Sequence, residues 1–173
     1  MAEGRLIDIV SSGFDAGVRL VGSIPRGMIA VPLPRTLTFI CVASPGYLDR
    51  FGEPQTPEEL QRHRCIGHRM PCGKFYRWEF ERAGQEVVID ANGPVVLNDE
   101  ELMVEAAIEG MCIADVEDWA AEAALSDGRL RKVLTAWLPP PEGVAVYHPG
   151  HRAVPPALRA FLDIVKDLWR RKP

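Results

Sequence analysis

Long apolar runs are missing from this 173-residue chain, which nowhere approaches the roughly 20 consecutive apolar residues of a membrane span. The N-terminus also lacks the basic region followed by an apolar region that marks an export signal. Cysteine is scarce, and the four cysteines show none of the spacing of a disulfide scaffold. We therefore expect no membrane association and a reduced, cytoplasmic setting.

Positive charge is also in short supply. Lys and Arg number 20 against 24 Asp and Glu, which gives a formal net charge of −4 and a pI of about 5.6. A chain that grips a phosphate backbone by itself is usually basic, and the one basic cluster here, Arg170–Lys172, lies at the chain end. Apolar residues make up 47%, which suffices for one domain or two small lobes.

Familiar catalytic motifs are absent as well. The sequence contains no G-x-S-x-G elbow, no H-E-x-x-H pair and no P-loop. The acids Asp99, Glu100 and Glu101 open an expected helix, where acids usually complement the helix dipole. We therefore expect that the chain is not an enzyme and carries no cofactor.

One segment, "HRCIGHRMPC", does look like a metal site, because His63, Cys65, His68 and Cys72 are zinc-ligand types within ten residues. On a strand, however, side chains alternate between faces. His63 and Cys65 would then share one face and His68 would take the other. No second ligand pair appears elsewhere, so we expect no metal. A small metal or thiol enzyme built on this segment, with Cys72 as a reactive thiol, remains a rival reading.

Strand-like and helix-like periodicities alternate along the chain, which favours an α/β fold. A hairpin that turns at Ala83–Gln85 makes at least one sheet mixed. The expected strands are 15–20, 28–33, 36–43, 64–69, 75–93 as a hairpin, 111–116, 129–134 and 144–149; the expected helices are 5–14, 44–52, 56–60, 98–110, 117–128 and 155–171.

Three helix starts carry capping signals. Ser44 precedes Pro45, and Gly52 follows as a stop. Thr56 and Glu59 form the pattern of a capping box. Asn98 or Asp99 can cap the helix that ends at Gly110. The last helix carries one apolar stripe, which we expect to leave surface uncovered and to promote self-association; its residues are Leu158, Phe161, Leu162, Val165, Leu168 and Trp169.

The order of several segments resembles the effector-binding domain of LysR-type transcriptional regulators. The most specific are "GFDAGVR" at 13–19, "ASPGYL" at 43–48 and "PPALRAFLDIV" at 155–165. The resemblance covers essentially the whole chain. It implies a small-molecule effector-sensing and dimerising domain. A solute-binding protein of the same fold, serving transport, is the alternative.

The resemblance also implies the fold: a periplasmic-binding-protein-like (type II) α/β fold of two lobes with mixed sheets. The first lobe would combine residues 1–42 and 144–173, and the second would be 43–143. An effector would bind in a cleft between them. The family's winged helix-turn-helix and the opening of the first lobe have no counterpart in the sequence, so we expect an incomplete first lobe. DNA contact would then require a helix-turn-helix domain absent from this chain, and the partners would be an effector and a second copy or more of the chain.

Ligands in such folds sit where strand ends and helix N-termini face the crevice. Two arginines and the helix opened by Asn98 favour a small organic anion, while the acids that follow Asn98 oppose it. The candidate effector-binding residues are Arg19, Arg69, Met70, Pro71, Cys72, Asn98, Asp99 and Tyr147.

Overall fold

The computed structural model describes residues 9, 13–70, 73–150 and 154–170, and the side chains up to residue 167. The expected helix over 5–14 lies largely outside these residues. Two compact units are present: a larger one over residues 38–140, and a smaller one that combines residues 9 and 13–37 with 141–150 and 154–170. The lobe boundaries expected at 42/43 and 143/144 stay a prediction. No helix in the described part of the chain is long and apolar enough to span a membrane.

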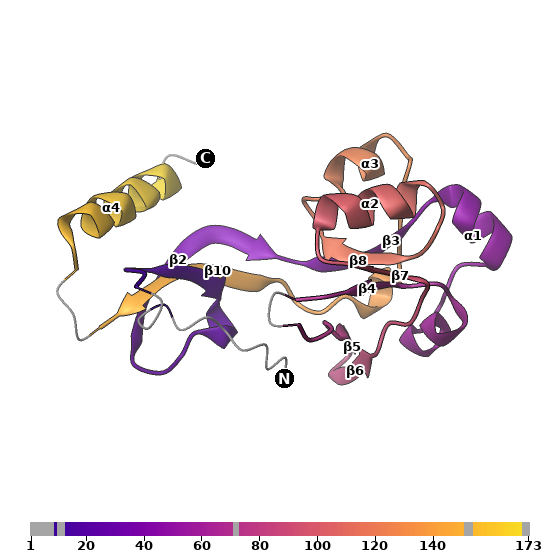
Figure 1. The fold of residues 1–173 in the computed structure, drawn as a ribbon, viewed down its shortest axis with the longest axis horizontal. Coiled ribbons are helices and arrows are strands. Elements are labelled where there is room, and N and C mark those ends of the chain that lie inside the picture. Colours follow the sequence, from indigo (N-terminus) through magenta and orange to yellow (C-terminus); the bar gives the residue numbers. More distant parts are fainter. Residues whose placement is uncertain (1–8, 10–12, 71–72, 151–153, 171–173) are drawn as a thin grey trace. The chain divides into compact units, whose positions relative to one another are not determined.

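The larger unit is built on a sheet whose middle strand is β3 (Phe39–Ala43; Figure 1). This strand pairs antiparallel with β8 (Ala114–Glu117) on one side and with β9 (Arg131–Val133) on the other. The strands β4 (Ile66–His68) and β7 (Val95–Leu97) pair in parallel, and a parallel bridge from Cys65 to Ile113 places β4 beside β8. The run "FICVA" is continuously apolar because both faces of β3 are buried.

Alternate residues of β3 supply two separate hydrophobic cores. Ile40 and Val42 face the core that is closed by α2 (Glu100–Ile108) and α3 (Glu122–Ser126). Cys41 and Ala43 face the other core, which also contains residues of the hairpin formed by β5 (Trp78–Arg82) and β6 (Gln85–Ile89). Figure 1 shows α2 and α3 on one side of β3 and β8, with the hairpin on the other. The second core also holds Tyr47, Leu48, Leu60, Cys65, Trp78, Phe80, Ile89, Ile113, Val133, Leu134 and Trp137.

The predicted hairpin is confirmed. Its strands are β5 (Trp78–Arg82) and β6 (Gln85–Ile89), with Arg82 opposite Gln85. The two turn residues, Ala83 and Gly84, have φ angles of 52° and 81°. Two consecutive positive φ angles match the right-handed twist of the strands they join.

Two of the three predicted helix starts are also confirmed. In α1 (Pro45–Phe51) the Oγ atom of Ser44 accepts a hydrogen bond from the Tyr47 N–H at 3.3 Å, and Gly52 ends the helix with φ of 84°. In α2 the carboxylate of Asp99 accepts from the Leu102 N–H at 3.0 Å. Each cap satisfies a backbone donor that the first helical turn leaves open.

The predicted capping box at Thr56 is wrong. Residues Pro57–Arg62 form a 3₁₀ helix, η2, and the Thr56 side chain makes no capping hydrogen bond. The Glu59 carboxylate instead accepts a hydrogen bond from the Gln55 N–H at 2.8 Å. A capping box would use the N–H of Thr56, the next residue along the chain. The tighter winding of a 3₁₀ helix changes which backbone N–H the side chain can reach. The predicted helix over 117–128 is also shorter, because only Glu122–Ser126 is helical.

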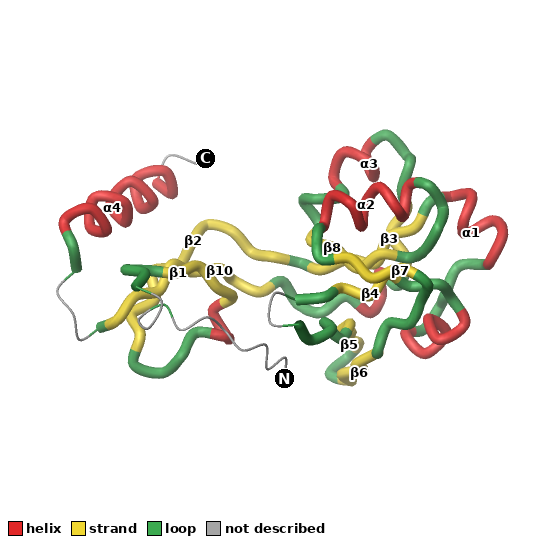
Figure 2. The backbone as a smooth tube through the Cα atoms, viewed as in Figure 1, coloured by secondary structure: helices red, strands yellow, loops and turns green. Residues whose placement is uncertain are grey.

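The smaller unit contains an antiparallel sheet in the order β1, β10, β2 (Figure 2). These strands are Gly17–Leu20, Glu142–Pro149 and Met28–Leu37. Short 3₁₀ turns lie at Val21–Ser23 in this unit and at Thr135–Trp137 in the larger one.

The last helix, α4 (Pro156–Arg170), covers this sheet only in part. Leu158 and Leu162 pack with Val146 of β10. Phe161, a member of the stripe that the sequence expects to stay partly uncovered, is 48% exposed, and Ile164 is 59% exposed. Leu158 and Leu162 are four positions apart and therefore share the face that meets the sheet, while Phe161 lies at its flank.

Two adjacent residues of α2 offer a direct test of the first core. Met103 is fully buried, whereas Leu102 is 56% exposed. Met103→Ala should lower the free energy of unfolding by about 2–5 kcal/mol, because it leaves a cavity. Leu102→Ala should change it by less than about 0.5 kcal/mol. Urea denaturation measures both, and equal losses would contradict this assignment of the core.

Candidate functional site

Three strands of the larger unit end at one edge of its sheet. Since β4 and β7 are parallel and β4 lies parallel to the start of β8, the carboxyl ends of all three strands point the same way. Those ends are His68, Leu97 and Glu117. Asp99 caps α2 just after β7, so the N-terminus of α2 also lies at this edge. Strand ends beside a helix N-terminus are where α/β folds commonly bind ligands.

Two carboxyl groups meet at this edge. Glu100 is half-buried, and its carboxyl group lies near the backbone of Glu117, which lowers the pKa of Glu100. Burial, the nearby charge of Glu117 and that of Asp99 together raise the pKa of Glu100 to about 7. The Glu117 carboxylate also accepts a hydrogen bond from the indole N–H of Trp119. Glu100 is therefore partly protonated near neutral pH and can donate as well as accept hydrogen bonds.

Aromatic rings adjoin these carboxyl groups. The ring of Tyr76 lies 5.5 Å from that of Phe39 and 6.1 Å from that of His68. The Tyr76 N–H donates to the His68 carbonyl at 2.9 Å, which fixes the segment before β5 against β4. Burial lowers the pKa of His68, although Glu117 nearby opposes that shift. We call His68, Tyr76, Glu100 and Glu117 the strand-end cluster.

A further acid lies inside the sheet. Asp115 is 5% exposed, and the Cys41 thiol donates to its Oδ1 at 3.8 Å across the β3–β8 pair. Burial is the main reason that the pKa of Asp115 rises to about 7, and the charges of Glu100 and Glu79 add to the rise. Burial likewise raises the pKa of the Cys41 thiol.

The histidine and cysteine residues of the apparent metal segment do not converge. Tyr47 Oη lies 3.2 Å from His63 Nδ1, and the Cys65 thiol donates to the Leu60 carbonyl at 3.7 Å. Burial raises the pKa of Cys65 to about 12, which keeps its sulfur protonated and a poor ligand. In the described part of the chain, no three His, Cys, Asp or Glu residues are placed to hold a metal ion. Cys72 lies outside it.

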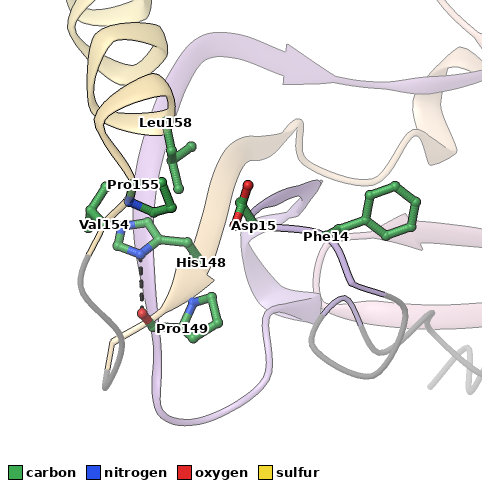
Figure 3. Close-up of a pocket in the computed structure, with 7 residues that line it drawn as sticks. All are labelled: Phe14, Asp15, His148, Pro149, Val154, Pro155 and Leu158. Carbon is green, nitrogen blue, oxygen red and sulfur yellow. Dashed lines mark hydrogen bonds between the residues drawn. The ribbon is translucent and has the colours of Figure 1, made fainter.

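The smaller unit has a cavity of about 110 Å³ where α4 meets the sheet (Figure 3). His148 is buried there, and its Nδ1 lies 3.3 Å from the Pro149 carbonyl, to which it can donate. In Figure 3 the imidazole lies beside Val154 and Pro155, while the Phe14 ring points away from it. A space of this size could hold a few water molecules, with His148 and Asp15 as the polar side chains that line it.

A family model described as the LysR substrate binding domain matches residues 1–170. The chain belongs to this family. LysR regulatory domains have the type II periplasmic-binding-protein-like fold, so the α/β fold class expected for this LysR domain is confirmed.

Individual relatives agree. This LysR domain is 36% identical over 164 residues to the uncharacterized HTH-type transcriptional regulator YcaN of Escherichia coli, an alignment that covers 95% of the chain and 53% of YcaN. It is 34% identical over 162 residues to the regulator PgrR of the same species, covering 93% of the chain and 54% of PgrR. The full-length structure of the Vibrio cholerae virulence activator AphB matches with a TM-score of 0.77 and 25% identity, over 97% of the chain and 56% of AphB. The chain thus spans about half the length of these relatives.

The predicted effector-binding residues of this LysR domain lie in both units. Arg19 and Tyr147 belong to the smaller unit, where the Arg19 guanidinium lies 4.8 Å from the centre of the buried Tyr147 ring. Tyr147 lies on β10 opposite Gly17, and a Cβ atom on Gly17 would come within 2.7 Å of the tyrosine ring. Tyr147 therefore packs closely against β1, and its effector role stays a prediction.

The remaining candidates belong to the larger unit or lie outside the described residues. Arg69 is exposed directly after β4, and its backbone N–H donates to the Leu97 carbonyl at 2.8 Å. Met70 follows it, half-buried. Asn98 is exposed, and Asp99 is engaged as the α2 cap. Pro71 and Cys72 lie outside the described residues.

Sequence reasoning missed His68, Glu100 and Glu117 as candidate site residues. Glu100 was interpreted as a dipole complement, although the structure sets it against β8. A usable signal existed for the other two: each directly follows a buried, mostly apolar run, "CIG" or "CIADV", and therefore lies where a strand ends.

Asp115 predicts a pH-dependent stability. Because its folded-state pKa is raised, the native state holds a proton that the unfolded state loses near pH 4, so stability falls as the pH rises from about 4 to about 7. Asp115→Asn removes this contribution. Urea denaturation measures the free energy of unfolding of both proteins. Relative to the native protein, that of the variant should rise by roughly 2–4 kcal/mol between about pH 5 and pH 8. Parallel pH curves for the two proteins would contradict the burial of this acid.

Proposed function

We propose that this chain is the small-molecule-sensing and self-associating part of a LysR-type transcriptional regulator, and that it is not an enzyme. The match to the LysR substrate binding domain over residues 1–170 carries this proposal. YcaN and PgrR are both named as transcriptional regulators, which favours this role over a transport protein or a metal or thiol enzyme. DNA contact and a cytoplasmic location would follow from the role of the whole regulator.

Self-association is part of the same proposal. On α4 the apolar side chains of Phe161 and Ile164 are about half exposed, and Phe14 and Val18 of the same unit are 59% and 58% exposed. Apolar surface of this kind is often covered by a second subunit. A homodimer or a higher oligomer of the chain would cover it.

The effector class that we propose is a small organic anion. Arg69 provides an exposed guanidinium at the end of β4, which can bind a carboxylate through two parallel hydrogen bonds. The N-terminus of α2 adds backbone dipole at the same edge. The Asp99 carboxylate accepts a hydrogen bond from the Leu102 N–H, so its charge is partly neutralised by the cap and repels a ligand anion less. Glu100, with a pKa of about 7, is partly neutral and can donate a hydrogen bond to the ligand.

The first test is a thermal-shift screen of aromatic and aliphatic carboxylates, with amines of matched shape as the control set. We expect carboxylates to raise Tm by a few degrees, because a ligand that binds only the folded state stabilises it. Arg69→Ala should remove the shift. Arg62→Ala, which alters an exposed arginine on η2, should keep it. Stabilisation by amines alone, or carboxylate shifts unchanged in both Arg19→Ala and Arg69→Ala, would overturn the anion proposal.

The second test uses pH. Carboxylate affinity should weaken as the pH rises from about 6 to about 8, because Glu100 loses the proton that it donates and gains a repelling charge. Glu100→Gln keeps a donor and should make the affinity independent of pH in this range. Asp115→Asn, which removes the other acid with a pKa of about 7, should keep the pH dependence. Calorimetric titration at each pH measures these affinities, and a pH dependence that persists in Glu100→Gln assigns it to another group.

A further inference from the structure

A second hollow lies at the opposite edge of the larger unit from the strand-end cluster. In the β3–β8 pair, Phe39 is opposite Glu117 and Val42 is opposite Ala114. The start of β3 is therefore at the cluster, and its end, at Ser44, is at the far edge. Figure 1 shows α1 leading away from that end. The hollow has a volume of about 480 Å³ and lies between the start of α1, the end of α2 and the loop before β9.

The floor of this hollow is fixed. Ser44 is buried, and its Oγ atom is held as the α1 cap by the Tyr47 N–H. Gly110 has φ of 70°, and a Cβ atom there would come 3.2 Å from Ser44 Oγ. Gly46, in contrast, has open space in front of it, because a Cβ atom there meets nothing within 4 Å. The hollow is therefore preformed, which lowers the cost of ordering a bound ligand.

The walls combine apolar surface with positive charge. Pro45, Phe51 and Ile108 supply the apolar part. Arg50 from α1 and Arg129 from the loop before β9 both line the hollow, against one acid, Glu109. The three charged side chains sum to one positive charge. The wall thus offers two guanidinium groups from separate segments beside an exposed aromatic ring.

The interactions that Arg50 and Arg129 make with protein groups are weak, so a ligand can replace them. Arg129 pairs with Asp127 at 2.8 Å, but both side chains are about half exposed, and such surface pairs are worth little. The Arg50 guanidinium lies 5.1 Å from the centre of the Phe51 ring, and the Arg64 guanidinium lies 5.6 Å from it. Phe51 therefore holds positive charge close to the apolar wall. A ligand anion can replace Asp127 as the partner of Arg129 and bind Arg50 at the same time.

We propose that this hollow is a second binding site, separate from the strand-end cluster, for a small organic anion that carries an apolar ring. The ring lies against Pro45, Phe51 and Ile108, and the anionic head binds Arg50 and Arg129. Two guanidinium groups suit a head with several oxygens, such as a phosphate or a carboxylate. This site does not depend on the effector class proposed for the strand-end cluster.

The test uses the 173-residue chain and nitrogen–proton NMR spectra. Phenyl phosphate is the probe, and phenol and benzylamine are the neutral and cationic controls. The Gly110 amide should shift in a saturable way with phenyl phosphate and at least tenfold more weakly with either control. The Gly46 amide, identified by its loss in Gly46→Leu, should shift with the same Kd.

Four variants separate the site from its surroundings. Arg50→Gln and Arg129→Gln should each weaken phenyl phosphate binding about tenfold, the equivalent of one lost charge-assisted contact. Gly46→Leu should abolish the Gly110 shift, because a Cβ atom there meets no protein atom within 4 Å and the rest of the side chain occupies the hollow. Arg62→Gln should leave the Kd unchanged. The proposal is overturned if Gly110 shows no saturable shift, if phenol binds equally well, or if Arg50→Gln, Arg129→Gln and Gly46→Leu all bind like the native chain. Arg69→Ala should not alter this binding, which distinguishes it from the effector proposal.

Discussion

The pairing of β3 with β8 is the constraint on which the larger unit depends. Both faces of β3 are covered, one by α2 and α3 and the other by the hairpin core. A polar substitution at Ile40 or Cys41 would therefore damage one core directly and the other through the shared backbone. Because β8 ends at Glu117, the same register also determines which charged group faces the α2 N-terminus.

The same register places buried apolar side chains and acids at alternate positions of the short strand β8. Ala114 and Val116 of β8 face the α2 side, and Asp115 faces Cys41 in the sheet. The strand thus alternates between side chains that bury area and acids with a functional or titrating character. Glu100 completes the arrangement, because its carboxyl group lies near the backbone and the charge of Glu117 at the end of β8. The candidate site is therefore an extension of the core rather than a loop laid over it.

The sequence could predict what depends on neighbouring residues. The Ala83–Gly84 turn, the Ser44 cap and the Asp99 cap each depend on contacts within four residues, and all three are confirmed. The Asp115–Cys41 contact joins residues 74 positions apart. The proximity of Glu100 to Glu117 likewise follows from tertiary pairing.

The capping box at Thr56 failed for a related reason. Its pattern was local, but the segment winds as a 3₁₀ helix whose Leu60 is buried in the core, so packing set the geometry. On α4 the sequence expects an apolar stripe that stays partly uncovered. Periodicity gives the direction of that stripe, while the sheet beneath it decides that Leu158 and Leu162 are covered and Phe161 is not.

The two acids with a pKa of about 7 also change the net charge of the molecule at neutral pH. The formal charge of −4 counts every carboxyl group as ionised. With Asp115 and Glu100 each about half protonated at neutral pH, the mean charge is closer to about −3. The domain therefore takes up or releases protons near neutral pH, and its electrophoretic mobility varies with pH there more steeply than its histidine content implies.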